Sequence, residues 1–456
     1  MYRVLAPGLA GLLLLCAGCF EAAEYRPWTG EADADADAGT DADAETGPSS
    51  LLVSPLGHSP TADAIKINAV TQESREALRL EWRPVAAANQ PRQWTAVADA
   101  TLLGTDVKEW RITGLQPGAD YEYRVSDGIG APYPGRFVTQ RLPGQGFTFA
   151  LLADTHIFVE SPEDVAHVLE PVAELITADR PDLVLHLGDV LDYHVFGFND
   201  PPPDESWPRL GMLAYREMTG RLLGRTAHFA MIGNWDGESG YFSPAEIERS
   251  RSQRQLYLPN PEPTTYPEGG SEHEDYYAFT WGDALFVVLN VMSYTMVPHE
   301  LTAGPADDWT LGAEQLAWLA QTLEQADARW RFLCIHHPVG GNGGDGEQGA
   351  NSAYGRGGGR AAYVGQQAEV HDLMLQHGVQ VFFYGHDHVF HDMEVDGVHY
   401  TLPGSAGAPW KFVTAETGYE TYWPESGYGR VRVEPEQLTI EFVSMWGEVL
   451  NTIEIE

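Results

Sequence analysis

The stretch VFFYGHDHVFH, residues 381–391, places two histidines on either side of an aspartate, directly after a run of large apolar residues. Side chains alternate along an extended strand, so the imidazoles of His386 and His388 could point to the same side. Taken alone, the stretch is better explained by a pair of surface histidines in a turn. A functional interpretation therefore needs support from other parts of the chain.

Polar side chains also follow four other apolar segments that are typical of buried strands. These segments end in Asp154-Thr155-His156, Gly188-Asp189-Val190-Leu191-Asp192, Gly233-Asn234-Trp235-Asp236 and His336-His337-Pro338. In open α/β sheets, ligands bind beyond the carboxyl ends of the strands. Five strand ends that bring carboxylate, amide and imidazole groups to one rim predict a functional site at that rim.

The series DxH, GDxxD, GN-x-D, HH and GHxH resembles the motifs of the calcineurin-like metallophosphoesterase superfamily, over roughly residues 147–456. The resemblance implies a binuclear metal centre at the strand ends. One metal would be held by Asp154, His156 and His388, the second by Asn234, His336 and His386, and Asp189 would bridge both. The alternative is a core cluster without metal, which four histidines and two aspartates at strand ends make a poor explanation.

This ligand set suits phosphoryl chemistry. Two divalent ions bring four positive charges against two anionic ligands, so the site keeps about +2 and can bind a phosphoryl group. Metals roughly 3.5–4 Å apart can share a hydroxide that attacks phosphorus in line. Nitrogen and oxygen ligands without thiolate suit two divalent or trivalent ions of Fe, Mn, Zn or Co, and the sequence does not choose among them.

Trp235 is the main departure from the family pattern, which has histidine after the Asn of GN. An indole N–H donates a hydrogen bond but does not deliver a proton near neutral pH, and a missing general acid costs roughly 10²–10⁴-fold in rate. Three explanations stay open. Another imidazole (His337, His194 or His299) substitutes, the substrate has a good leaving group, or activity is weak.

Asp192 and His337 are expected beside the ligands, where such groups orient them. The resemblance also bears on a purple Fe(III)–tyrosinate centre, in which a tyrosine lies three positions beyond the bridging aspartate. Asp192 has that spacing here and Tyr193 lies one residue later, while His156 stands where the purple pattern has no ligand. We therefore expect no such centre.

The elements that would position these residues alternate between apolar strands and segments with helical spacing, such as SPEDVAHVLEPVAELITADR and LGAEQLAWLAQTLEQA. This alternation predicts an α/β domain over residues 146–456. The family resemblance implies a four-layer α/β/β/α sandwich.

Residues 51–142 contain short alternating segments, such as AIKINAV and ALRLEWRP, and predict a small β-sandwich. Leu115, Pro117, Tyr121 and Tyr123 resemble the tyrosine corner of fibronectin type III-like domains. A sandwich in front of the catalytic domain resembles the architecture of purple acid phosphatase-like proteins.

The N-terminus, MYRVLAPGLAGLLLLCAGCF, has the pattern of a secretory signal over residues 1–19. CAGC resembles a bacterial lipoprotein signal in which Cys19 is lipidated, although Cys16 stands where Leu is usual. An ordinary cleaved signal is the alternative, and both export the protein. Residues 20–50 contain a run of alternating Asp and Ala and predict a disordered acidic linker. We expect a bacterial lipoprotein of the outer membrane, periplasm or cell surface, attached to the membrane through Cys19.

The formal charge is 27 − 66 = −39, so a nucleic acid or an anionic membrane surface is not an expected partner. The predicted function is an exported binuclear metal-dependent phosphoesterase that hydrolyses small phosphomonoesters or phosphodiesters, with His337, Asp192 and Trp235 beside the metals. The alternative is a weakened enzyme that acts as a binding or scaffold lipoprotein. The glycine-dense segment after His337 is either a lid, in which Arg356 or Arg360 touches substrate, or a plain loop.

Overall fold

The computed structural model describes residues 51–72, 78–85, 93–97, 100–159, 161–193, 206–296, 309–340, 365–407 and 421–456. Residues 44–456 form one compact unit, which holds all of these ranges. The predicted signal with Cys19, the acidic linker, His194, His299, Arg356 and Arg360 lie outside the described residues.

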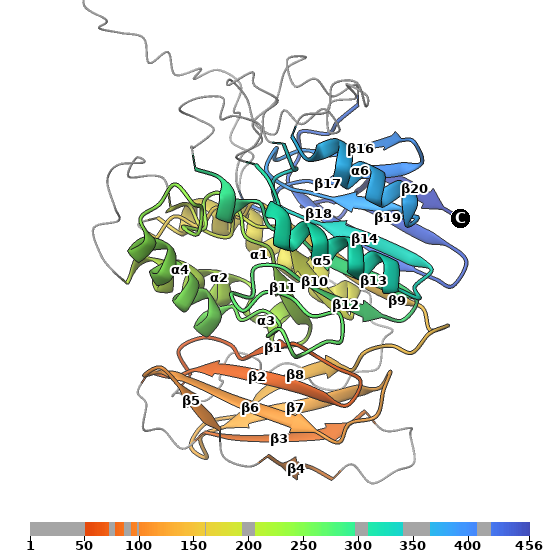
Figure 1. The fold of residues 1–456 in the computed structure, drawn as a ribbon. Coiled ribbons are helices and arrows are strands. Elements are labelled where there is room, and N and C mark those ends of the chain that lie inside the picture. Colours follow the sequence, from red (N-terminus) through yellow and green to blue (C-terminus); the bar gives the residue numbers. More distant parts are fainter. Residues whose placement is uncertain are drawn as a thin grey trace, which may run out of the picture. The chain divides into compact units, whose positions relative to one another are not determined.

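Two four-stranded antiparallel sheets form the N-terminal part (Figure 1). One sheet has the order β1 (Leu56–His58), β2 (Ala64–Val70), β6 (Val107–Thr113), β5 (Thr101–Leu103), and the other β4 (Thr95–Ala96), β3 (Arg79–Pro84), β7 (Asp120–Ser126), β8 (Tyr133–Val138). This order corresponds to the ABED and C′CFG sheets of immunoglobulin-like sandwiches. The predicted all-β sandwich is thus confirmed.

The turn before β7 has the geometry of a tyrosine corner. The hydroxyl of Tyr121 accepts a hydrogen bond from the backbone N–H of Gln116 at 2.7 Å, as a tyrosine corner requires. Along β7, Tyr121, Tyr123 and Val125 are buried and alternate with partly exposed residues. The specific likeness to fibronectin type III domains stays a prediction.

Two mixed six-stranded sheets form the centre of the remaining described chain. The first has the order β11 (Ala227–Ala230), β10 (Leu183–His186), β9 (Phe147–Leu152), β18 (Gly427–Val433), β19 (Leu438–Ser444), β20 (Val449–Ile455). The second has the order β12 (Tyr277–Trp281), β13 (Ala284–Val288), β14 (Trp330–Cys334), β15 (Val381–Phe383), β17 (Val398–Pro403), β16 (Phe390–Val395). Because β9, β10 and β11 are parallel, as are β13, β14 and β15, their carboxyl ends lie at one edge of each sheet.

Aromatic side chains fill the space between these two sheets. Phe149 of the first sheet lies 5.0 Å, 5.8 Å and 6.1 Å from Phe286, Phe332 and Phe383 of the second, measured between ring centroids. All four side chains are completely buried. The two sheets therefore pack face to face. Because side chains alternate along a strand, every second residue faces outward and can pack against a helix.

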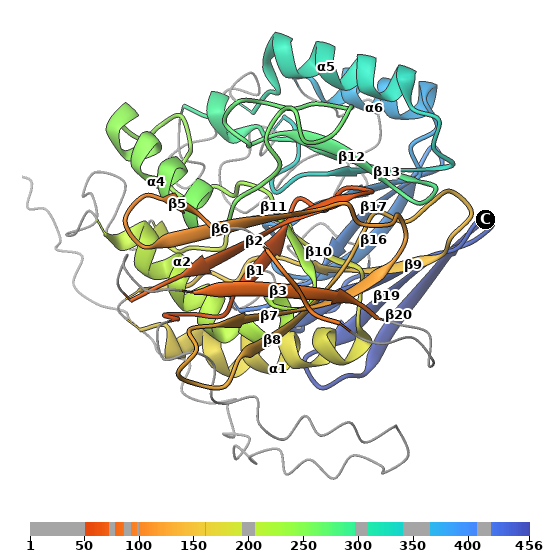
Figure 2. The ribbon, with the colours of Figure 1, turned by 90° about the horizontal axis from the view of Figure 1, so that it is seen from below.

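Helices cover both outer faces, as Figure 2 shows with α1 (Glu163–Asp179) on one side and α5 (Gly312–Gln325) and α6 (Gln367–Gln376) on the other. α1 buries Val165, Val168, Leu169, Val172 and Ile176, the spacing of an apolar helix face. Among the described residues, the remaining helical elements are α2 (Trp207–Met218), α3 (Gly220–Leu223), α4 (Pro244–Tyr257) and the 3₁₀ turn η2 (Met292–Tyr294). The four-layer α/β/β/α prediction is confirmed.

Arg216 of α2 links the β-sandwich to the part of the chain that contains the two six-stranded sheets. Its guanidinium is fully buried and donates to Asn68 Oδ1 at 2.7 Å, to the backbone carbonyl of Ser54 at 2.8 Å, and to those of Asn68 and Tyr257 at 3.1 Å. Burial lowers the pKa of Arg216 to about 10. A buried cation with hydrogen-bond acceptors from both parts makes this junction part of the core rather than a loose linker contact.

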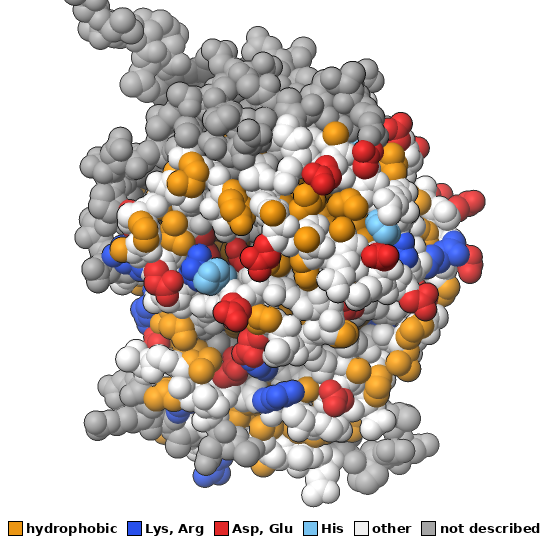
Figure 3. Space-filling view, in the orientation of Figure 1, with side chains coloured by type: hydrophobic (Ala, Val, Ile, Leu, Met, Phe, Trp, Pro, Cys, Tyr) orange, Lys and Arg blue, Asp and Glu red, His pale blue; other side chains and the backbone are white. Residues whose placement is uncertain are grey.

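On the face drawn in Figure 3, Lys and Arg side chains are scattered among acidic and apolar ones. Within the described ranges, no helix is both long enough and apolar enough to cross a membrane.

Candidate metal centre

Five residues that follow the strands adopt left-handed backbone conformations. Their φ angles are 55° for Asp154, 46° for His156, 54° for Asp189, 78° for His386 and 58° for His388. Such conformations cost about 1–3 kcal/mol each in a residue with a Cβ, and they persist where the surroundings over-determine them. Their concentration at these strand ends marks the loops as functional.

Two glycines let these loops approach one another closely. A Cβ added to Gly188, which has φ 93°, would lie 2.8 Å from both Gly233 N and His336 Cβ. A Cβ added to Gly233 would lie 2.0 Å from Asp189 Oδ1. The glycines of the GD and GN motifs are therefore needed because any side chain there would push the candidate ligands apart.

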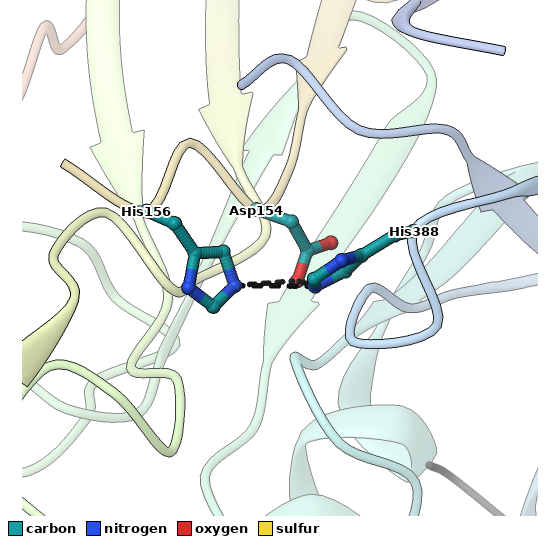
Figure 4. Close-up of side chains that lie close together, drawn as sticks. All are labelled: Asp154, His156 and His388. Atoms are coloured by element: carbon teal, nitrogen blue, oxygen red, sulfur yellow. Dashed lines mark hydrogen bonds and ion pairs between the residues drawn. The ribbon is translucent and has the colours of Figure 1, made fainter. Parts of the chain in front are cut away.

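The first candidate group consists of Asp154, His156 and His388, which converge from loops after β9 and β15 (Figure 4). The Nε2 atoms of the two histidines are 3.1 Å apart. Asp154 Oδ1 lies 3.2 Å from His388 Nε2 and 3.8 Å from His156 Nε2. Three ligand atoms therefore surround one small buried volume.

The second candidate group consists of Asp189, His336 and His386. Asn234 joins it, because its Oδ1 lies 3.0 Å from His336 Nε2 and 2.8 Å from His386 Nδ1. All four side chains are completely buried. The structure thus brings together all seven residues that the sequence predicted as metal ligands, in two neighbouring groups.

Asp189 lies between the two groups. Its Oδ2 is 3.3 Å from His156 Nε2 and 3.1 Å from His336 Nε2. Its Oδ1 accepts a hydrogen bond from the backbone N–H of Trp235 at 2.8 Å, so Oδ2 is the oxygen that faces both imidazoles. A buried carboxylate oxygen that faces both groups in this way has the position of a bridging ligand.

The tautomer of His336 also fits a metal ligand. Its Nδ1 lies 2.8 Å from the backbone carbonyl oxygen of Leu187, to which it must donate its proton. Nε2 is then left with a lone pair directed toward Asp189 and Asn234, which is the usual arrangement for a metal-bound imidazole. The converging nitrogen and oxygen atoms, all buried, therefore fit two cations.

The electrostatics agree with a site built for positive charge. Burial disfavours the charged forms, but the carboxylates of Asp154 and Asp189 outweigh it and raise the pKa of His156 to about 10. Burial lowers and Asp189 raises the pKa of His336, with a net rise. Burial raises the pKa values of Asp154 and Asp189, but the facing imidazoles lower both overall. Both carboxylates therefore stay ionised and available to cations.

Asp236 holds two of the ligand loops together. Its Oδ2 accepts from the backbone N–H groups of Gly233 at 2.8 Å and Asp189 at 3.0 Å, and its Oδ1 accepts from that of Leu191 at 3.0 Å. Burial and the charge of Asp189 raise the pKa of Asp236 to about 7. The sequence placed Asp236 in the GN-x-D motif but gave it no role, since its partners lie on another loop.

His186, the last residue of β10, holds a second pair of loops. It is completely buried, its Nδ1 accepts from the backbone N–H of Gly188 at 3.2 Å, and its Nε2 lies 3.2 Å from Thr155 Oγ1. The Thr155 hydroxyl donates to the backbone carbonyl of Val190 at 3.1 Å. Burial lowers the pKa of His186 to about 3, so it stays neutral. Sequence reasoning missed this residue, which lies within a strand rather than after one.

The three residues predicted beside the metals lie close to the two groups. The Trp235 ring is 5.4 Å from that of His156, at an interplanar angle of 66°. The charge of Asp192 contributes to the raised pKa of His156. The buried ring of His337 lies 3.8 Å from Trp309 and 4.4 Å from His386, and its Nδ1 is 2.9 Å from the carbonyl oxygen of Pro338. Their catalytic roles stay predictions.

Tyr193 lies in an aromatic cluster. Its ring packs edge-on against Trp207 at 5.3 Å and Phe242 at 5.1 Å. Burial raises the pKa of its hydroxyl. Both features suit a packed phenol better than a tyrosinate.

Comparisons with known proteins agree with this geometry. The sequence model of one family, described as calcineurin-like phosphoesterase, matches residues 147–390. A search of curated protein sequences finds no match. Among solved structures, one titled "Structure of PhoD" is similar with a TM-score of 0.64 and 15% identity, over 90% of this chain and 89% of that chain. A purple acid phosphatase, PPD1 from yellow lupin (Lupinus luteus) seeds, is similar with a TM-score of 0.60 and 14% identity, over 88% of this chain and 74% of that chain.

Proposed function

This chain belongs to the calcineurin-like phosphoesterase family, and we propose that it is an exported enzyme that hydrolyses small phosphate monoesters or diesters with two metal ions. The observation that carries the proposal is the position of Asp189 Oδ2, within 3.3 Å of an imidazole nitrogen from each candidate group. A shared carboxylate of this kind is what a pair of cations requires.

The ligands divide between the two ions as the geometry groups them. Asp154, His156 and His388 would hold one ion, Asn234, His336 and His386 would hold the other, and Asp189 would contact both. When bound, the ions supply the positive charge that stabilises a phosphoryl group during displacement and that activates water. Fe, Mn, Zn and Co all suit these nitrogen and oxygen ligands.

Hydrogen bonds from neighbouring residues hold the candidate ligands in position. The backbone N–H of Trp235 orients Asp189, and Asp236 and His186 fix the loops on either side of it. Burial of all the ligands excludes bulk water, so the charge of the site acts on a bound phosphate at low dielectric. This local charge would offset the acidic balance of the whole chain, and a small ester therefore suits the site as substrate.

Export rests on the N-terminal sequence. A short leucine-rich segment precedes Cys19, and the acidic linker over residues 20–50 would separate a lipid-anchored N-terminus from the folded part. Fractionation of cells that express the wild type and Cys19→Ala tests this part. The wild type should be in the membrane fraction, and loss of the cysteine should release the protein from it.

The hydrolytic proposal is tested on purified protein. Bound metal is measured first, and then the hydrolysis of an aryl phosphate and of a bis-aryl phosphate, with Asp189→Asn as the control. Two metal ions per chain and turnover that Asp189→Asn abolishes are the expected results. Two metal ions without turnover would instead support the second candidate, a phosphoesterase-like binding or scaffold lipoprotein. The presence of Trp235, which cannot act as a general acid, favours that candidate.

A further inference from the structure

The backbone of Trp235 is fixed on both sides. Its N–H donates to Asp189 Oδ1 at 2.8 Å, and its carbonyl accepts from the N–H of Tyr193 at 3.0 Å. The preceding residue is also held, because the Tyr241 hydroxyl donates to the carbonyl of Asn234 at 2.8 Å. The backbone that carries the indole is therefore held in a fixed position beside the carboxylate of Asp189.

The Trp235 indole lies next to the first metal group. Its ring is set edge to face against His156, with 5.4 Å between centroids. Trp235 is partly exposed, whereas its neighbours Asn234 and Asp236 are buried. A phosphate bound at the metal group that contains His156 would thus place its ester substituent within reach of the indole.

The groups that the structure describes around this position do not favour a protonated leaving group. Indole does not deliver a proton near neutral pH. The two further imidazoles described beside the metal groups, His186 and His337, are both completely buried and directed to protein atoms. These described groups therefore support departure of the leaving oxygen as an anion, which only a weakly basic oxygen does readily.

We infer that Trp235 selects phosphate esters of aromatic alcohols, an inference that rests on the proposed hydrolytic function. An aromatic ring can pack against the indole, and a phenol-type hydroxyl has a pKa of about 10, far below that of an aliphatic alcohol. In the reaction, the oxygen of a water molecule forms a bond to phosphorus. The bond between phosphorus and the phenolic oxygen, which is attached to the aromatic ring, breaks. The electron pair leaves on that oxygen as a phenolate, and the proton of the water passes to solvent.

Binding of non-hydrolysable analogues tests the recognition step without turnover. Phenylphosphonate and cyclohexylphosphonate, which differ in aromaticity at similar size, are titrated by calorimetry into the metal-loaded wild type, Trp235→Phe and Trp235→Leu. In the wild type and in Trp235→Phe, phenylphosphonate should bind about 2- to 10-fold more tightly than cyclohexylphosphonate, which is the range expected of an aromatic pair. The preference should disappear in Trp235→Leu. Equal binding of both analogues to the wild type would overturn the inference, and two bound metals verify that each variant is folded.

Turnover tests the leaving-group step. In the wild type, kcat/KM for substituted phenyl phosphates and cyclohexyl phosphate should fall steeply as the pKa of the leaving alcohol rises. Trp235→His should flatten this dependence, with the largest gain, up to about 100-fold, for the alkyl ester. A wild type that hydrolyses phenyl and cyclohexyl phosphate equally well would overturn the inference and leave the phosphoesterase proposal intact. Absence of turnover with every ester would overturn the hydrolytic proposal instead, and the binding comparison would then decide the aromatic selectivity by itself.

Discussion

The Nε2 atoms of His156 and His388 lie 3.1 Å apart, although the two residues are 232 positions apart in the chain. Two neutral imidazoles cannot both present lone pairs at this distance in a buried site without a proton or a cation between them. The carboxylates of Asp154 and Asp189 lie beside them and supply negative charge. Together with Asp154, the pair therefore has the geometry of a candidate cation site, in which a proton on His156 takes the place of the cation when no metal is bound.

Metal binding should release protons. Burial lowers the pKa of His156, but Asp154 and Asp189 outweigh burial and raise it to about 10 in the metal-free protein. A protonated imidazole must lose its proton to bind a cation, so the cation displaces a proton from His156 at pH 7. The metal affinity should therefore increase as the pH is raised from 7 to about 10. The same raised pKa stabilises the metal-free fold below about pH 6.5, and this contribution is lost as the pH rises toward 10.

Calorimetry in buffers of different ionisation enthalpy measures the number of protons released. His399→Gln is the matched control, because the imidazole of His399 also has a raised pKa, from its contact with Asp392, and belongs to neither metal group. It should release as many protons as the wild type. Metal binding without proton release would contradict the electrostatic description of the site.

Asp236→Asn should weaken metal binding without removing a ligand. The amide nitrogen cannot accept from a backbone N–H, so at least one of the three hydrogen bonds to Asp189, Gly233 and Leu191 is lost. A loss of this kind typically costs about 1–3 kcal/mol of stability, and metal affinity should fall about 10- to 100-fold. Competition with a chelator measures the affinity. The exposed Asp327→Asn should leave it unchanged, and equal affinities in both variants would exclude a positioning role for Asp236.

His186→Phe should act on both metal groups through Thr155 and Gly188. The phenyl ring keeps the shape of the imidazole but loses the contacts of both nitrogens. A double-mutant cycle with Thr155→Val should give a coupling energy of about 0.5–3 kcal/mol in metal binding. His391→Phe serves as the control, because His391 is buried and bonded to the carbonyl of Thr421 outside both groups. Independent effects of His186 and Thr155 would refute the proposed connection.

Arg216→Met should destabilise the whole described unit. The substitution leaves Asn68 Oδ1 and the carbonyls of Ser54, Asn68 and Tyr257 without their donor in a buried junction. We expect a loss of about 3 kcal/mol or more in the free energy of unfolding. Arg221→Met, which removes an exposed ion pair with Glu174, should cost less than about 1 kcal/mol. Denaturant unfolding of both variants compares them, and similar losses would show that the junction is not a core.

The sequence was sufficient to predict that the candidate metal ligands lie together, because each of them comes within a few residues of the end of an apolar strand. Once the strands are parallel neighbours, residues such as Asp154 and Asp189 must meet at the same edge. The burial of the strands on both faces was also predictable, since Leu183, Val184 and Leu185 in β10 are apolar on both faces, whereas the two-sheet arrangement came only from the family resemblance.

The supporting residues were not predictable in the same way, because their partners come from other loops. Asp236 and Asp189 are 47 positions apart, and His186 and Thr155 are 31 positions apart. α4 escaped prediction for a different reason. Its buried residues include Ser250 and Arg254, and the latter pairs with the buried Glu238 at 2.6 Å, so the helix shows no apolar period.

An anomalous-difference map from crystals of the protein grown or soaked with Mn²⁺ or Zn²⁺ shows directly whether the site holds two ions. We expect two peaks, one beside Asp154, His156 and His388 and one beside Asn234, His336 and His386. Both should lie within coordination distance of Asp189, about 2.0–2.2 Å. A single peak, or peaks that do not share Asp189, would contradict the account of a binuclear phosphoesterase.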